Sequence, residues 1–171
     1  NAHKDFDFEI YFSEVFHKNN GFDIVIANPP YIRASKIEKS LKSIYKNNFL
    51  TAYGSYDIYS LFFERTFDLL KKGGVYCFIT SNKFLIADYG KPLRDLMLKT
   101  THLVKLIDLA DCKRVFSSAL VSPIITIGKN EIKPKYEVSV AVLKDDDVFK
   151  LNSISFTNTV DPFSIHLINE P

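Results

Sequence analysis

Four runs of apolar residues, separated by more polar segments, predict the strands of a sheet. The runs are Phe22–Ala27, Val75–Thr80, Leu103–Leu109 and Val121–Ile127, and they are rich in β-branched residues. The first run is apolar almost throughout, which is typical of a strand buried on both faces in a parallel sheet. It ends at Asn28-Pro29-Pro30, because proline has no N–H group to offer a neighbouring strand.

The polar segments between these runs carry helical patterns. Asp57–Lys72 has apolar residues at helical spacing and ends in a basic turn followed by Gly73-Gly74, which predicts a helix with a glycine stop. Lys91–Lys99 predicts a helix with proline in its first turn. Ile32–Leu50 is polar and basic, and its apolar spacing predicts a surface helix within a long loop. Ile10–Phe16 is irregular and predicts a short strand or loop.

The order of these elements predicts an α/β fold, with a mixed sheet and crossover helices. The last two runs follow each other without a helix, which indicates that the sheet ends in antiparallel strands. Further along, Glu137–Leu143 and Ile154–Thr157 predict short strands, and Asp145–Asp147 predicts an acidic turn. We therefore predict a main unit over residues 1–130, and a linker or small β extension over residues 131–171.

The composition is that of one ordinary globular domain. The chain has 171 residues, 46% of them hydrophobic, and its 22 basic and 20 acidic residues give a net charge of +2. This balance neither requires nor excludes a nucleic-acid partner, because a local patch can still be basic. No window approaches 18 uninterrupted apolar residues and no signal-peptide core is present, so we predict no membrane segment. Two cysteines are too few for a disulfide scaffold, which favours a cytoplasmic setting.

The tetrapeptide Asn28-Pro29-Pro30-Tyr31 directly follows a predicted strand, and in open α/β sheets ligands bind outside the carboxyl ends of strands. The exocyclic amine of a nucleobase is a poor nucleophile, because its lone pair is delocalised into the ring. The Asn28 side-chain carbonyl and the Pro29 backbone carbonyl can each accept one amine hydrogen, which pulls the nitrogen toward a tetrahedral form. Tyr31 can stack on the base, a contact worth about 1–3 kcal/mol. The alternative is a turn that only ends the strand.

Three longer stretches carry a family resemblance. FDIVIANPPYI, YGSYDIYSLFFERTFDLLKKGGVYCFITSNKFL and VFSSALVSPIITI occur in this order. Together they resemble the amino-directed DNA methyltransferases, and more narrowly the adenine-N6 methylase portion of type IIS/IIG restriction-modification enzymes. The likeness covers about residues 8–128, and Phe8–Phe16 is similar to that subfamily's approach to its catalytic motif.

This resemblance implies the catalytic, C-terminal half of a Rossmann-like methyltransferase domain. It further implies S-adenosylmethionine as the methyl donor, double-stranded DNA as the partner, and a target adenine flipped out of the duplex. By position in the motif, Asn28 and Pro29 would bind the target amine and Tyr31 would stack on the adenine. Phe116 matches the second aromatic residue against the base, although a plain core role is the alternative.

The resemblance also implies contacts with the methyl donor. Asn28 and Pro30 lie where the family approaches it, and Asp57 belongs to a motif that lines the same pocket. Asp57 has an alternative role in the electrostatics of a first helical turn. Tyr59 and Phe84 are expected to be core residues rather than contacts.

One departure from the family concerns cofactor binding. The family uses a Gly-rich turn after its first strand and an acidic residue after its second, whereas the only glycine before Asn28 is Gly21. We therefore expect the cofactor-binding half of the sheet and a target-recognition domain to be absent, and the isolated chain to be inactive. The first residue, Asn1 rather than Met, fits a piece of a longer protein. A truncated sheet would expose an edge, which predicts self-association.

A basic segment follows the tetrapeptide. Its cations are Arg33, Lys36, Lys39, Lys42 and Lys46, and beside the turn they can contact DNA phosphates. A solvated helix face is the alternative. The four histidines (His3, His17, His102 and His166) lack metal-ligand spacing, so we predict no metal site.

Two other functions remain open at this point. Protein-glutamine and RNA amino-methyltransferases use the same tetrapeptide on an amide or amine, although the basic insert and the SNKFL segment favour DNA. A non-catalytic binding or assembly module is the third possibility, because the cofactor half is expected to be absent.

Overall fold

The computed structural model of the chain describes residues 6–112, 122–145 and 158–160. The strands are β1 (Phe22–Ala27), β2 (Leu70–Ser81), β3 (His102–Asp111), β4 (Pro123–Lys129), β5 (Val138–Lys144) and β6 (Asn158–Val160). The α-helices are α1 (Phe8–Tyr11), α2 (Ser13–Asn19), α3 (Lys39–Asn48), α4 (Tyr59–Leu69) and α5 (Lys91–Thr100). Three short 3-10 helices are η1 (Ala34–Lys36), η2 (Asn82–Leu85) and η3 (Asp88–Gly90).

The described strands form one mixed sheet in the order β1-β2-β4-β3-β5-β6. β1 and β2 are parallel and are joined through α4, as a crossover requires. β4 runs antiparallel between β2 and β3, which confirms the predicted antiparallel ending. β5 then adds in parallel beside β3, so the segment after residue 130 contributes a strand to this same sheet.

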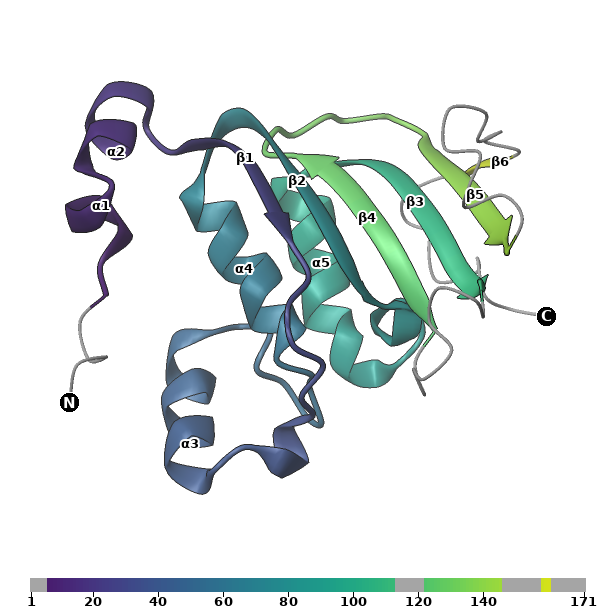
Figure 1. Cartoon of the computed structure of the whole chain (residues 1–171), viewed down its shortest axis with the longest axis horizontal. Helices are drawn as coiled ribbons and strands as arrows, with labels where there is room; N and C mark the ends of the chain where they lie inside the picture. The colour runs from purple at the N-terminus through teal and green to yellow at the C-terminus, as the bar shows by residue number, and fades with distance from the viewer. Residues whose placement is uncertain (1–5, 113–121, 146–157, 161–171) are drawn as a thin grey trace.

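Helices α4 and α5 lie side by side against one face of the sheet, behind β2 and β4 in the view of Figure 1. The core between these layers joins aromatic residues of α4 and β2 to aliphatic residues of α5, β3, β4 and β5. Phe63 is central to it, because its ring packs 4.6 Å from that of Phe78 and 6.0 Å from that of Tyr76. This layer fixes α4 over β2, and thereby places the start of α4 near the end of β1.

Most of the predicted elements are confirmed. The four apolar runs form β1 to β4, the basic segment contains α3, Lys91–Lys99 lies in α5, and Glu137–Leu143 corresponds to β5. The predicted strand Ile154–Thr157 and most of the acidic turn lie outside the described residues. The predicted division at residue 130 stays a prediction.

Ile10–Phe16 is not the predicted strand or loop, since it contributes to the short helices α1 and α2. Asp7 caps α1 by accepting a hydrogen bond from the N–H of Glu9 at 2.8 Å. Phe12 and Phe16, four residues apart, both pack edge-on against Phe22 at 5.4 and 5.5 Å. The pattern that indicated helical turns was therefore the four-residue spacing of these aromatic residues.

Gly73-Gly74 is not a helix stop. Helix α4 ends at Leu69, and β2 begins at Leu70 and continues through both glycines. The register with β1 shifts here, and the Asn130 side chain donates to the Leu70 carbonyl at 2.7 Å. Gly73 has φ of 77°, a backbone conformation that glycine adopts readily. The glycines thus allow an irregular start of β2. In the sequence alone, the same basic and glycine residues fit the end of a helix equally well.

β1 is not buried on both faces, contrary to the prediction. It is the edge strand of the described sheet, and Ile24 and Ile26 are 62% and 76% exposed. Val25 and Ala27 alternate with them and pack toward the core. The apolar run therefore forms a strand whose residues Ile24 and Ile26 are not covered by any element in the part of the chain that the structure describes.

Candidate active site

The tetrapeptide forms the turn at the carboxyl end of β1, which is the position expected for a ligand site in such a sheet. Asn28 and Pro30 are exposed, whereas Pro29 is buried. The parallel neighbour β2 ends at Ser81 on the same side of the sheet. The Asn28 side chain is thus available to a ligand above the carboxyl ends of both strands.

Tyr31 is held at two points. Its hydroxyl donates a hydrogen bond to the carbonyl of Ile79 on β2, at 3.3 Å. Its ring packs edge-on against Tyr59, with ring centroids 6.4 Å apart and ring planes at 87°. Burial raises the pKa of the Tyr31 hydroxyl, and the nearby Asp57 charge raises it further. The ring is therefore fixed in a half-buried position, neutral at physiological pH.

The segment after Tyr31 is pinned to the segment before α4. The Ala34 N–H donates to the Tyr56 carbonyl at 2.8 Å, and the Ile58 N–H donates to the Ile32 carbonyl at 2.9 Å. These bonds flank an isolated antiparallel bridge between Arg33 and Asp57. This short pairing brings Asp57, distant in sequence, next to the tetrapeptide.

Asp57 is buried and incompletely satisfied. Its side chain is 8% exposed, and its Oδ1 atom has no hydrogen-bond partner among the residues that the structure describes. Burial raises the pKa of this carboxyl, while the backbone N–H groups of Ile58 and Ile32 and the charges of Arg33 and Lys83 oppose the shift. A buried acceptor without a donor is expensive, so this oxygen suits a ligand that donates a hydrogen bond.

Tyr59 and Phe84 are core residues, as predicted. Both are almost fully buried and their rings pack 6.3 Å apart. The Tyr59 hydroxyl shares a hydrogen bond of 2.9 Å with the hydroxyl of Tyr89 in η3. Sequence reasoning missed Tyr89, because nothing in the sequence indicates a partner 30 residues away.

The predicted DNA-contacting cations lie on the segment that follows the tetrapeptide. Arg33 precedes η1, and Lys36 ends it. Lys39, Lys42 and Lys46 belong to α3, where spacings of three and four residues place them along one side. Lys42 is half-buried and the other four are exposed. Phe116, the predicted second aromatic contact, lies outside the described residues.

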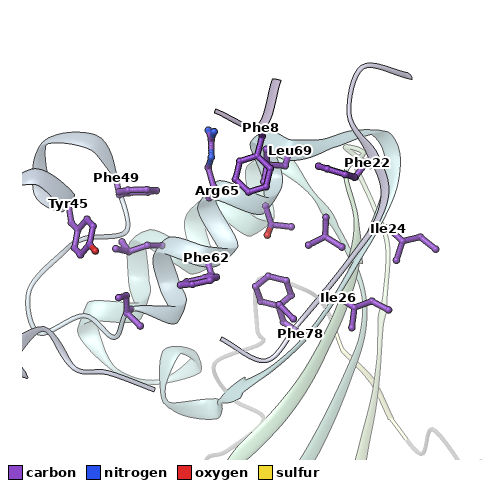
Figure 2. A pocket seen from close by; sticks show the side chains of 15 residues that line it. Phe8, Phe22, Ile24, Ile26, Tyr45, Phe49, Phe62, Arg65, Leu69 and Phe78 are labelled. Carbon is purple, nitrogen blue, oxygen red and sulfur yellow. The ribbon is translucent and has the colours of Figure 1, made fainter. Parts of the chain in front are cut away.

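A groove of about 520 Å³ lies beside the exposed edge of β1. Figure 2 shows Phe22 and Ile26 of β1 on one side, Phe62 of α4 and Phe49 on the other, and Phe8 at one end. Its lining is mostly apolar, and it offers no cluster of acceptors or donors for a polar ligand. The groove therefore suits packing against further apolar side chains.

Two further features concern ligands and membranes. Within residues 6–112, 122–145 and 158–160, no three His, Cys, Asp or Glu side chains gather in a group that could hold a metal ion. In the same ranges, no helix is both long and apolar enough to cross a membrane.

A family model and curated proteins match most of the described site. The model of the family described as Eco57I restriction-modification methylase matches residues 1–116. The chain is 36% identical over 110 residues to the type II methyltransferase M.PaeR7I of Pseudomonas aeruginosa, covering 64% of this chain and 19% of that protein. It is 36% identical over 114 residues to M.XhoI of Xanthomonas vasicola, covering 67% and 21%. The chain thus spans about a fifth of the length of these relatives.

Solved structures share the fold. The type IIG restriction endonuclease BpuSI matches with a TM-score of 0.63 and 17% identity, covering 84% of this chain and 19% of that one. A nuclease-deletion mutant of the type ISP restriction-modification enzyme LlaGI, solved with a DNA substrate mimic, matches at 0.63 and 20%, covering 92% and 19%. A protein of Listeria monocytogenes assigned to the class I S-adenosylmethionine-dependent methyltransferases matches at 0.57 and 20%, covering 81% and 38%. The predicted α/β methyltransferase fold is thereby confirmed.

Proposed function

Because the chain belongs to the Eco57I restriction-modification methylase family, we propose that it is the catalytic half of a site-specific DNA adenine-N6 methyltransferase. The observation that carries the proposal is the exposed Asn28 at the carboxyl end of β1, beside a Tyr31 ring held by Ile79 and Tyr59. The tetrapeptide thus combines acceptors for an amine with a ring for its base. The relatives named type II methyltransferases support the same reaction class.

In the proposed mechanism, the target adenine leaves the duplex and stacks on Tyr31. The Asn28 side-chain carbonyl and the Pro29 backbone carbonyl each accept a hydrogen bond from the amine, which localises the nitrogen lone pair. S-adenosylmethionine, when bound, supplies an activated methyl group on a sulfonium. The Asn28 and Pro29 carbonyls would hold the nitrogen so that its lone pair is directed toward that methyl group. The surplus amine proton then passes to solvent.

The residues present fit part of the methyl-donor site. We assign Asn28, Pro30 and Asp57 to it, because the Asp57 Oδ1 is a buried acceptor that an ammonium or hydroxyl group of S-adenosylmethionine can satisfy. The chain spans about a fifth of the length of its curated relatives, so we propose that the remaining contacts lie in the part of such proteins that this chain does not cover, and that the isolated chain is inactive.

Double-stranded DNA is the proposed partner. Arg33, Lys36, Lys39, Lys42 and Lys46 would contact its phosphates from the segment beside the turn. The neighbour LlaGI, solved with a DNA substrate mimic, supports this choice of partner. Phosphate contacts of this kind would position the duplex without reading its sequence.

The test is methyl transfer by the full-length protein that contains this chain. Asn28→Ala should lower kcat on duplex DNA by about 10²-fold or more, which is the usual effect of removing one group that stabilises a transition state. Asn47→Ala, an exposed asparagine of α3, is the matched control and should retain activity. Methylation of RNA or a glutamine-containing peptide instead of duplex DNA would contradict the proposed substrate, and an active Asn28→Ala variant would contradict the proposed mechanism.

A further inference from the structure

Tyr89 meets the site from a segment that has no role in the reaction as proposed. It lies in η3 and its hydroxyl is 2.9 Å from that of Tyr59. Tyr59 is fully buried, and a buried phenol hydroxyl needs a hydrogen-bond partner. Burial raises the pKa values of both hydroxyls, so both are neutral and one donates to the other. Tyr89 therefore satisfies the polar end of the ring on which Tyr31 rests.

The segment that presents Tyr89 is itself held firmly. Arg94 of α5 donates from Nη1 to the carbonyls of Phe84 and Ala87, at 2.6 and 3.1 Å. Gly90 packs so closely on the Phe84 backbone that a Cβ atom there would collide with its carbonyl. These contacts fix the path of residues 84–90, so the Tyr89 ring has a defined position relative to α4.

The contacts then run from Tyr89 to the base-stacking residue. The Tyr59 hydroxyl shares a hydrogen bond with that of Tyr89. The Tyr59 ring packs edge-on against Phe84 and Tyr31, with ring centroids 6.3 and 6.4 Å apart. The Tyr31 hydroxyl is anchored separately on Ile79. An anchor at the hydroxyl alone still permits the ring to turn about its long axis, so the contact with Tyr59 is what sets its plane.

We propose that Tyr89 is a positioning residue, which through its hydrogen bond to Tyr59 sets the plane of the Tyr31 ring that stacks on the flipped adenine. The inference rests on the proposed function, because it needs a base on Tyr31. It adds a residue of η3, far from the tetrapeptide in sequence, to those that determine the rate.

The test uses Tyr89→Phe in the full-length protein, with Tyr53→Phe as the control. Tyr53 is 58% exposed in the same region, so loss of its hydroxyl should leave activity unchanged. Tyr89→Phe should lower kcat about 10-fold at a temperature well below the Tm, with little change in KM for S-adenosylmethionine. The fluorescence of 2-aminopurine at the target position, which reports an extruded base, should fall in parallel. A structural role alone would lower the Tm and leave both readouts unchanged.

A double variant sharpens the result. Replacing both partners of a buried hydrogen bond by apolar groups of the same shape removes the unsatisfied hydroxyl. Tyr59→Phe combined with Tyr89→Phe should therefore recover most of the Tm, whereas kcat should stay about 10-fold low, because the hydrogen bond that positions Tyr59 is still absent. Recovery of kcat by the double variant would contradict the positioning role. If Asn28→Ala abolishes methylation while Tyr89→Phe keeps full kcat, the role of Tyr89 is wrong and the proposed function stands. If Asn28→Ala is active, the proposed function itself fails.

Discussion

At the residue scale, Asp57 links stability to the proposed site. Burial raises its pKa in the folded protein above the ordinary value of 3.8, so the folded state holds this proton more tightly than the unfolded chain does. Its contribution to stability is therefore most favourable below pH 3.8, and it falls as the pH rises through the folded-state pKa. At neutral pH, the charged carboxylate opposes folding.

Asp57→Asn should accordingly stabilise the isolated chain at pH 7. We expect a rise in Tm of about 2–4 °C, the shift that about 1 kcal/mol produces in a domain of this size. The difference should vanish below pH 3.8, where Asp57 is neutral in both states. Asp23→Asn is the control, because its hydrogen bond to Lys71 lowers the Asp23 pKa and its loss cannot stabilise the protein at pH 7. Thermal unfolding at both pH values decides this, and equal Tm values for Asp57→Asn and the unaltered chain at pH 7 would contradict it.

How far a site residue could be predicted depended on the range of its contacts. Asn28-Pro29-Pro30-Tyr31 is contiguous and follows an apolar strand, so its place at the end of β1 was readable from the sequence. The anchor of Tyr31 on Ile79 spans 48 residues, and the Tyr59–Tyr89 bond spans 30. Such contacts follow from how α4 and η3 pack over β2, and no local pattern encodes that packing.

At the scale of elements, two glycines allow a prediction about close packing. Gly90 has no room for a Cβ beside the Phe84 backbone, whereas Gly73 has open space around it and a φ of 77°. Gly90→Ala must displace the η2–η3 segment and should destabilise the chain by about 1–3 kcal/mol. Gly73→Ala meets only the left-handed backbone penalty of about 1–2 kcal/mol. Urea denaturation of both variants measures the two losses in the free energy of unfolding. In the full-length protein, only Gly90→Ala should also lower methylation, because only this change displaces Tyr89.

The errors in predicting elements share one physical origin. Gly73-Gly74 and the preceding basic pair fit a helix end. In the structure, however, Asn130 forms hydrogen bonds with Leu70, Gly73 and Gly74, and these bonds make the segment part of β2. Ile10–Phe16 forms helical turns because Phe22 offers an aromatic surface for their rings. In both places a tertiary partner decided between local conformations that the sequence left close in energy.

At the scale of the whole molecule, an apolar exposed region lies along the outer edge of β1. No strand in the described part of the chain pairs with its outer edge, Ile24 and Ile26 are exposed, and an apolar groove opens beside it (Figure 2). Exposed edges and contiguous apolar surface of this kind promote association. In the longer proteins that this chain resembles, we expect further chain to cover this side. For the chain alone, the available cover is a second copy.

We therefore expect the isolated chain of 19.6 kDa to self-associate in solution through the β1 edge. Ile26→Lys places a charge on the exposed face of the edge strand, and should shift the molar mass measured by light scattering toward that of the monomer. Ile132→Lys is the matched control, because Ile132 is 74% exposed, nearly as much as Ile26, but lies between β4 and β5. A monomeric mass for the unaltered chain at every concentration would exclude the association, whereas equal dissociation by both variants would place it on a surface other than β1.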